Sequence, residues 1–237
     1  MMLTILLALA VAVAQDPIHT AMAPAPRTDQ RWIDRNDQLT KMDKSAAEVI
    51  FLGDSITEGW ETTGKHIWDD QIARFKAINL GISGDRTQHV LWRIKNDNLK
   101  GANSAKLVVI MIGTNNSNGN DHTAEQIADG VKAIIKEVRQ RLPKAKVLAL
   151  AIFPRGKEPN PQRAKIQTAN ELIAKAADNK WVFYHDIGSH FTDMEGAISA
   201  QVMPDSLHLS EEGYRIWATH MTPIMRELLA LPSPDSL

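Results

Sequence analysis

Five short apolar runs, each separated from the next by residues of helical character, constrain the fold more than any other feature. Most of the runs are apolar throughout rather than alternating, which indicates strands that are buried on both faces. Strands that alternate with helices form parallel sheets covered by helices on both sides. The sequence therefore predicts an α/β domain with a five-stranded parallel sheet. The runs occupy residues 49–52, 77–80, 107–112, 147–152 and 181–184.

Two of the predicted helices begin at recognisable capping residues. Thr123 precedes Gln126 by three positions, which is the spacing of a capping box. Ser210 precedes Glu211 and Glu212, whose carboxylates favour the positive end of a helix. The predicted helices are residues 31–43, 86–96, 123–141, 162–178 and 210–229.

The N-terminal residues differ from the rest of the chain. Residues 3–13 are apolar or small and end in Ala12-Val13-Ala14, which is typical of a secretory signal and its cleavage site. The run is shorter than the roughly 20 residues needed to span a bilayer, so no stable membrane anchor is expected. We predict a signal peptide over 1–14, a secreted or periplasmic location, an Ala/Pro-rich linker over 15–27, one domain over 28–231 and a tail over 232–237.

Charge and cysteine content exclude several classes of function. The chain has 27 Lys and Arg against 28 Asp and Glu, so no excess of positive charge favours nucleic acid as a partner. It contains no cysteine, which excludes disulfides, thiolate metal sites and a cysteine nucleophile. His185 and His190 flank Asp186, but no third ligand falls at an obvious spacing, so we expect no metal. No other cofactor is indicated.

Polar, glycine-containing loops follow the first three predicted strands. They are Gly53-Asp54-Ser55, residues 81–85 and residues 113–116. In an open parallel sheet, ligands bind at the carboxyl ends of the strands, so these loops should meet. Late in the chain Asp205 and His208 lie three positions apart.

Together these loops contain the parts of a serine hydrolase. Ser55 is a candidate nucleophile, His208 a base and Asp205 its orienting acid. The backbone N–H groups of Ser55 and Gly81 and the side-chain amide of Asn115 are candidate donors to an oxyanion. Taken alone, Ser55 is better explained as a helix N-cap, and the other three blocks favour catalysis.

These four blocks, in this order, resemble those of the SGNH (GDSL) hydrolases. Within that superfamily the chain is most similar to the platelet-activating-factor acetylhydrolase catalytic subunits and their bacterial esterase relatives. The further similarity lies in residues 79–85, 89–93, 154–161 and 196–209. Where relatives often have a second glycine, this chain has Ser83, one residue before Gly84.

The resemblance implies a flavodoxin-like three-layer sandwich without a metal. It also implies Ser55, Asp205 and His208 as the catalytic triad, and Gly81 and Asn115 as oxyanion donors. The animal relatives form dimers, which leaves a homodimer open.

From their positions in the sequence, Ile56 and Leu207 are candidates to wall a small acyl pocket, and Trp60 to line the cleft. The predicted function is hydrolysis of short, acetyl-type esters, with an O-acetylated carbohydrate as the substrate. Two alternatives stay open at this stage. One is a lysophospholipase or thioesterase acting on longer acyl chains, and the other is a non-catalytic glycan-binding module.

Overall fold

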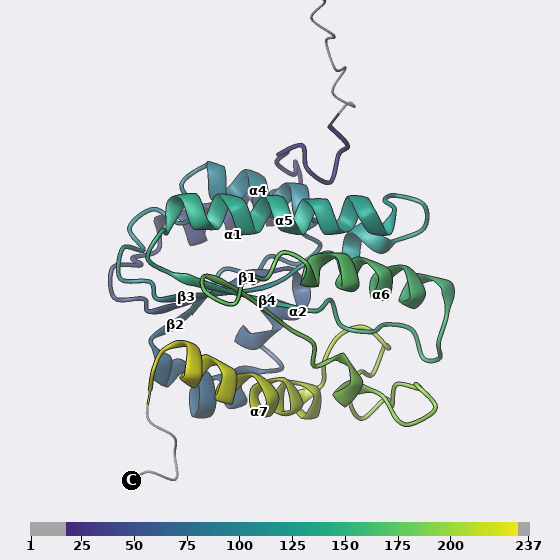
Figure 1. Cartoon of the computed structure of the whole chain (residues 1–237). Coiled ribbons are helices and arrows are strands. Elements are labelled where there is room, and N and C mark those ends of the chain that lie inside the picture. Colours follow the sequence, from purple (N-terminus) through teal and green to yellow (C-terminus); the bar gives the residue numbers. More distant parts are fainter. Residues whose placement is uncertain (1–17, 232–237) are drawn as a thin grey trace, which may run out of the picture.

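Five parallel strands form one sheet at the centre of the molecule (Figure 1). The computed structural model of the chain describes residues 18–231. The sheet has the order β2-β1-β3-β4-β5, and every residue of β1 and β3 is buried. The predicted five-stranded parallel sheet is therefore confirmed. The strands are β1 (Val49–Gly53), β2 (Ala77–Asn79), β3 (Leu107–Met111), β4 (Lys146–Leu150) and β5 (Val182–His185).

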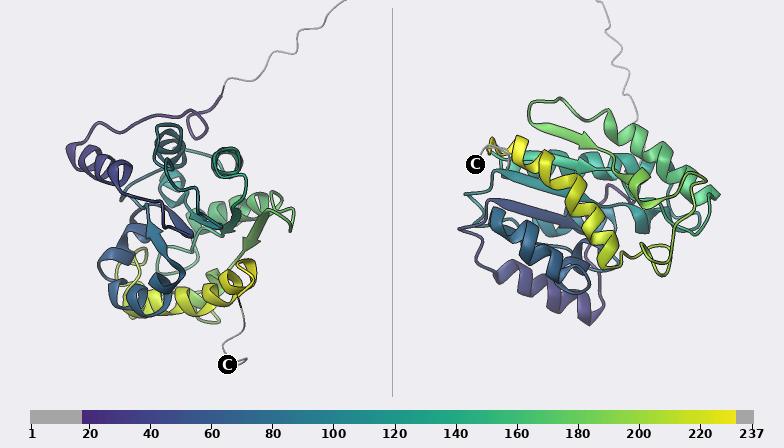
Figure 2. Two further views of the ribbon diagram at one scale, coloured as in Figure 1. Left: turned by 90° about the vertical axis from the view of Figure 1, so that its left-hand side faces the viewer. Right: turned by 90° about the horizontal axis from the view of Figure 1, so that it is seen from below.

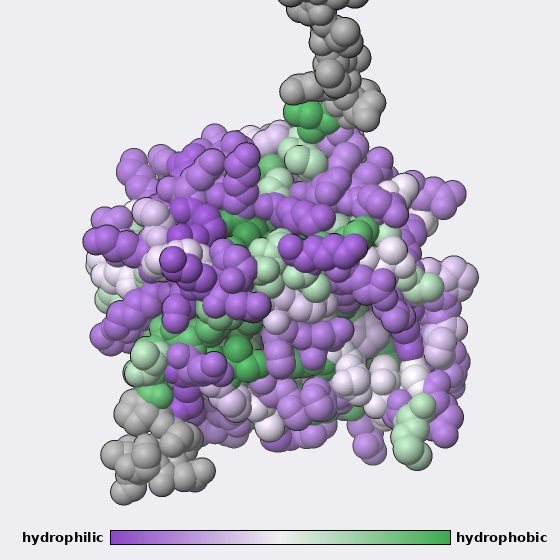
Figure 3. Space-filling model, viewed as in Figure 1, coloured by the Kyte–Doolittle hydropathy of each residue, from purple (hydrophilic) through white to green (hydrophobic). Residues whose placement is uncertain are grey.

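Helices cover both faces of the sheet and complete the three layers (Figures 1 and 2). One face packs against α1 (Gln30–Lys41), α4 (Thr87–Lys95), α5 (Ala124–Arg141) and α6 (Pro161–Ala174). The other face packs against α7 (Glu211–Leu228) and a series of short helices. Both predicted caps are present, because Thr123 Oγ1 accepts the Gln126 N–H and Ser210 Oγ accepts the Gly213 N–H. The surface seen in Figure 3 is mostly hydrophilic over these helices.

Short helices that the sequence did not predict connect β1 to β2. Helices of three to five residues are too short to show a 3.6-residue hydrophobic period, so periodicity cannot reveal them. They matter for function because the first of them begins at Ser55. They are α2 (Ser55–Glu58), η1 (Gly59–Glu61), α3 (Lys65–Ile67), η2 (Trp68–Ile72) and η3 (Ala73–Phe75).

An aromatic cluster joins these short helices to α7. The Trp60 ring lies 4.5 Å from Tyr214 and 5.0 Å from Trp217, measured between ring centroids. Tyr214 also donates its hydroxyl proton to the carbonyl oxygen of Ile56, at 2.8 Å. Trp60 and Trp217 are completely buried. The cluster therefore fixes α2 against the last helix of the chain.

The segment 18–27, most of the predicted linker, is bound to the domain. Ala21 is completely buried, and its carbonyl oxygen accepts a hydrogen bond from Thr87 Oγ1. The Ala25 N–H donates to the carbonyl oxygen of Gln88. The linker prediction is therefore wrong for these residues. Ala/Pro composition gives no periodic pattern, yet small side chains and free backbone groups are enough to dock an extended segment.

Some predictions concern residues that the structure does not describe. The proposed signal peptide over 1–14 and the tail over 232–237 lie outside the described residues, so they stay predictions, as do export and the homodimer. Within residues 18–231, no helix is both long enough and apolar enough to cross a membrane.

Replacing Trp60 by alanine should lower the free energy of unfolding by about 3–5 kcal/mol, because a large buried ring leaves a cavity. Trp181 is the matched control, since it is 37% exposed and packs mainly under the Arg139 guanidinium. Trp181→Ala should cost about 1 kcal/mol or less. Urea denaturation of both variants measures the difference. Equal losses would contradict the assignment of Trp60 to the core.

Candidate active site

Ser55 follows β1 directly and is the first residue of α2. Asp54 caps this helix, because its Oδ1 accepts the Ile56 N–H at 3.0 Å. A Cβ atom at Gly53 would lie 2.0 Å from Thr57 Oγ1 and 2.5 Å from the Met111 carbonyl oxygen. Only glycine allows the strand to turn so tightly into the helix. The turn places Ser55 at the carboxyl edge of the sheet.

His208 and Asp205 meet Ser55 from the loop that precedes α7. His208 Nε2 lies 3.0 Å from Ser55 Oγ, and His208 Nδ1 lies 2.6 Å from Asp205 Oδ2. The second oxygen of Asp205 accepts the backbone N–H groups of Leu207 and His208, at 3.0 and 2.7 Å. The structure thus brings the three predicted triad residues into one hydrogen-bonded chain.

The hydrogen bonds also set the charge of the acid. Burial by itself would raise the pKa of Asp205, but the bonds from the His208 ring and the backbone N–H groups outweigh it. Their net effect holds the pKa of Asp205 below its usual value. An ionised Asp205 orients the imidazole and would stabilise it once it has taken a proton.

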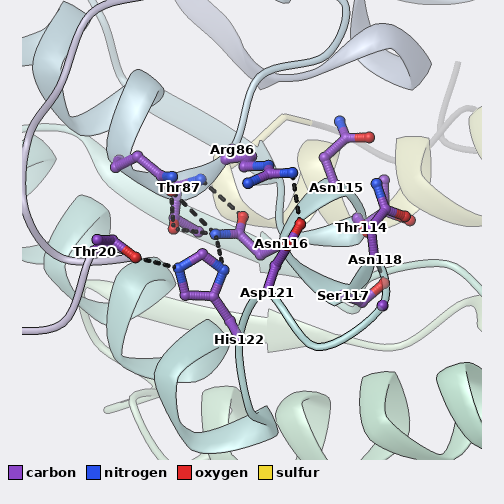
Figure 4. Close-up of polar contacts among 12 residues, drawn as sticks. Thr20, Arg86, Thr87, Thr114, Asn115, Asn116, Ser117, Asn118, Asp121 and His122 are labelled. Carbon is purple, nitrogen blue, oxygen red and sulfur yellow. Dashed lines mark hydrogen bonds and ion pairs between the residues drawn. The ribbon is translucent and has the colours of Figure 1, made fainter.

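Asn115 lies in the turn η4 (Thr114–Ser117), beside the first two loops. Its Nδ2 donates to the Asp85 carbonyl oxygen at 2.9 Å, which leaves the second amide proton for another acceptor. The neighbouring Asn116 faces inward and bonds Thr87 and His122, and in Figure 4 Asn115 extends away from that group. The Asn116 bonds hold the turn that presents Asn115.

The backbone N–H of Gly81 is not available as the oxyanion donor that the sequence predicted. Its N–H donates to Asn79 Oδ1 at 2.8 Å, and this bond is buried. A Cβ atom at Gly81 would lie 2.4 Å from the Glu58 nitrogen and 2.8 Å from the Thr57 carbonyl carbon. Glycine is needed here for close packing against α2. The prediction that the Gly81 N–H serves the oxyanion is therefore corrected.

Gly84, in the same loop, is the residue that the sequence analysis missed. It has a φ of 80°, which favours glycine, and no acceptor for its N–H is found among the described residues. The N–H of Ser55 likewise has no acceptor within residues 18–231. The signal in the sequence was Gly84 itself, the glycine directly before Asp85. Ser55, Gly84 and Asn115 are therefore the candidate oxyanion donors.

A cleft of about 240 Å³ opens beside Ser55 and His208. Ile56 and Trp60 do not line it, because both are buried in the core below the sheet. Leu207 is partly buried against the same core, and Leu209 takes its expected place at the cleft. Periodicity and neighbourhood in the sequence could not show which way these side chains face. The lining residues are Arg31, Ser55, Glu58, Gly59, Thr62, Thr63, Ser83, His208, Leu209 and Tyr214.

Comparison with known proteins agrees with this site. The GDSL-like Lipase/Acylhydrolase family matches residues 51–216. The chain belongs to this family. Platelet-activating factor acetylhydrolase IB subunit alpha1 of Bos taurus is 39% identical over 219 residues, which are 90% of this chain and 89% of that protein. This acylhydrolase is accordingly a carboxylic ester hydrolase, and the resemblance seen in the sequence is confirmed.

Two solved structures share the fold of the acylhydrolase. A GDSL-like lipase from Bacteroides thetaiotaomicron has a TM-score of 0.66 and 24% identity, covering 84% of this chain and 97% of that one. A carbohydrate acetylesterase from Sinorhizobium meliloti has a TM-score of 0.59 and 22% identity, covering 77% of this chain and 99% of that one.

Arg155 supports the turn that carries Asn115. Arg155 donates to the Thr114 carbonyl oxygen and to Asn118 Oδ1, so it holds the η4 turn by internal hydrogen bonds. Within residues 18–231, no group of three or more His, Asp or Glu residues could hold a metal ion. His190, one half of the histidine pair considered above, stacks on His220.

Asp54 is a completely buried carboxyl group next to the nucleophile. Burial raises its pKa to about 7, although the bond from the Ile56 N–H acts in the opposite direction. In the unfolded chain the pKa is near 3.8. Between these two values the folded protein holds a proton that the unfolded chain releases, so this group makes the protein less stable as the pH rises.

Asp54→Asn should remove that pH dependence, since asparagine can keep the helix cap and does not titrate. Between pH 5 and 7, the free energy of unfolding of the variant should rise relative to wild type as the pH rises. Asp178→Asn is the control. Three backbone N–H groups lower the pKa of Asp178 to about 2, so its contribution should stay constant over that range. Urea denaturation at several pH values checks both, and parallel curves for Asp54→Asn and wild type would contradict the burial effect.

Proposed function

We propose that the protein hydrolyses short acyl esters, chiefly acetyl esters of carbohydrates, through an acyl-serine intermediate on Ser55. The observation that carries the proposal is the hydrogen-bonded chain from Ser55 through His208 to Asp205, at 3.0 and 2.6 Å. A serine hydrolase requires this arrangement of hydroxyl, imidazole and carboxylate.

The reaction would proceed in two halves. His208 Nε2 takes the proton of Ser55 Oγ as that oxygen attacks the ester carbonyl carbon, and the protonated imidazole then returns the proton to the departing alcohol. In the second half His208 takes a proton from water as that water attacks the acyl-serine, and it returns the proton to Ser55 Oγ as the bond from Oγ to the acyl carbon breaks and the acid is released. The N–H groups of Ser55 and Gly84 and the Asn115 amide would stabilise the oxyanion in both halves.

The lining of the cleft supports a hydrophilic alcohol group. Arg31 and Glu58 form an ion pair of 2.8 Å on its wall, and Thr62, Thr63 and Ser83 add hydroxyl groups. A long acyl chain gains about 0.8 kcal/mol for each CH₂ group that it buries against apolar surface. The charges and hydroxyl groups in the wall add nothing to that gain, whereas a sugar could form hydrogen bonds with them.

The names of two similar proteins support an acetyl group. The Bos taurus relative is a platelet-activating factor acetylhydrolase, and the Sinorhizobium meliloti protein of the same fold is a carbohydrate acetylesterase. We therefore favour acetyl over longer acyl groups, and we favour a carbohydrate alcohol on the lining of the cleft.

Ser55→Ala should abolish acetate release, and Asn115→Ala should lower kcat by about 10²–10³, the cost of removing one oxyanion donor. Ser104 and Asn103 are exposed neighbours of the same types in the loop before β3. Ser104→Ala and Asn103→Ala should keep wild-type turnover. Stopped assays with p-nitrophenyl acetate measure all four variants. An Asn115→Ala variant with wild-type kcat would exclude that side chain from the oxyanion site.

The choice of substrate is tested by comparing esters. Turnover of p-nitrophenyl acetate should greatly exceed that of p-nitrophenyl octanoate, and acetate should be released from members of a panel of O-acetylated sugars. Ser55→Ala, measured on the same panel, gives the background. Faster hydrolysis of octanoate would favour the lysophospholipase or thioesterase alternative. Absence of acetate release from every sugar would refute the carbohydrate assignment.

A further inference from the structure

Hydrogen bonds hold the peptide groups on both sides of Ser83. Its N–H donates to Glu58 Oε2 at 2.5 Å, and its carbonyl oxygen accepts a hydrogen bond from Arg27 Nη1 at 2.6 Å. Glu58 is the last residue of α2, the helix that Ser55 begins. Arg27 lies 56 positions earlier in the chain, in the segment before α1. Ser83 is therefore fixed between the nucleophile's own helix and the N-terminal segment.

The bond from Arg27 sets the direction of the next N–H group. The Ser83 carbonyl and the Gly84 N–H belong to one planar trans peptide unit, in which they point in opposite directions. A carbonyl turned toward Arg27 thus turns the Gly84 N–H away from it. Ser83 lines the cleft beside Ser55 and Arg27 does not, so a Gly84 N–H that points away from Arg27 would face the nucleophile.

Arg27 is itself held in place. Its Nε donates to Asp29 Oδ2 at 2.9 Å, and Asp29 caps α1 by accepting the Trp32 N–H. Its Nη1 also lies 4.0 Å from Oδ1 of the buried Asp85. The guanidinium is therefore held by Asp29 through Nε and donates a hydrogen bond to the Ser83 carbonyl oxygen through Nη1.

The segment that carries Arg27, residues 18–29, which we call the strap, is bound along its length. Thr20 Oγ1 bonds His122, and His122 bonds Asn116, the neighbour of Asn115 (Figure 4). Further along, Ala21 and Ala25 bond Thr87 and Gln88 at the start of α4. The strap thus contacts the Gly84 loop directly and the turn that carries Asn115 through His122.

We propose that Arg27 is a positioning residue for catalysis, which orients the Gly84 N–H toward the oxyanion by holding the Ser83 carbonyl. The proposal rests on the proposed use of Ser55 as the nucleophile. Glycine at position 84 makes the bond necessary, because glycine rotates easily and its φ of 80° is not imposed by a side chain. Without Arg27, the peptide unit between Ser83 and Gly84 can rotate. The Gly84 N–H would then no longer point at the oxyanion.

Arg27→Met tests the proposal, since it keeps the aliphatic stem and removes the donor. We expect kcat for p-nitrophenyl acetate to fall about 10- to 100-fold, because small misplacements of a catalytic group are costly, while KM changes by less than about twofold. The affinity of a boronic acid, whose tetrahedral serine adduct occupies the oxyanion site, should fall in parallel with kcat. Arg27→Lys can reach the Ser83 carbonyl or Asp29 but not both, so its kcat should fall by less, about three- to tenfold.

Arg141→Met is the control. Arg141 also pairs with a carboxylate, that of Glu137, but it is the last residue of α5 and does not line the cleft. It should keep wild-type kcat and boronic acid affinity. If Arg27 only stabilises the fold, Arg27→Met will have a lower melting temperature but unchanged kcat and boronic acid affinity. That result would overturn the proposal. If Arg27→Met does not fold, Arg27→Lys decides, and wild-type kcat in that variant would refute the positioning role. Loss of activity in Ser55→Ala tests the nucleophile separately, so the two proposals can fail independently.

Discussion

The carboxylate of Asp85 is completely buried, and its oxygens accept hydrogen bonds from Trp32 Nε1 at 2.7 Å and Arg93 Nε at 2.9 Å. Arg93 is equally buried. Taking both charges out of water is costly, and loss of either partner of such a pair costs about 3–5 kcal/mol. Asp85 and Arg93 must therefore stay paired in the folded protein. Because the Asp85 backbone carbonyl receives the Asn115 amide, this buried pair also sets the position of an oxyanion donor.

The parallel sheet explains why these parts meet. All five strands end at one edge, so the loops after β1, β2 and β3 converge there without long connections. The loop before α7 then brings Asp205 and His208 across from the far end of the chain. The strap adds a contact from the N-terminal side, so that Ser83 and Gly84 are held from two directions. Catalytic geometry of this kind depends on the supporting hydrogen bonds as much as on the residues that touch the substrate.

The errors of the sequence analysis share one cause. Gly81 and Gly84 are both glycines of one loop, and only the bond from the Gly81 N–H to Asn79 shows that the first is occupied. Ile56 adjoins the nucleophile in sequence, yet a helical turn directs it into the core. Residues 18–27 have the composition of a linker, but their backbone groups find partners on α4. In each case the role of the residue depended on the direction in which its N–H group or side chain points. The residue type alone does not determine that direction.

The sequence by itself determined the layered α/β fold, the order of the polar loops and the identity of Ser55, Asp205 and His208 as residues that should meet. It could do so because apolar runs report burial, and because parallel strands place their carboxyl ends together whatever the details of packing. Only the tertiary structure decided which N–H groups are free, which side chains line the cleft and what holds the loop at Gly84. Those properties follow from hydrogen bonds between residues such as Arg27 and Ser83, which lie 56 positions apart. No local pattern in the chain records such a bond, because its two partners become neighbours only when the sheet and its helices have assembled.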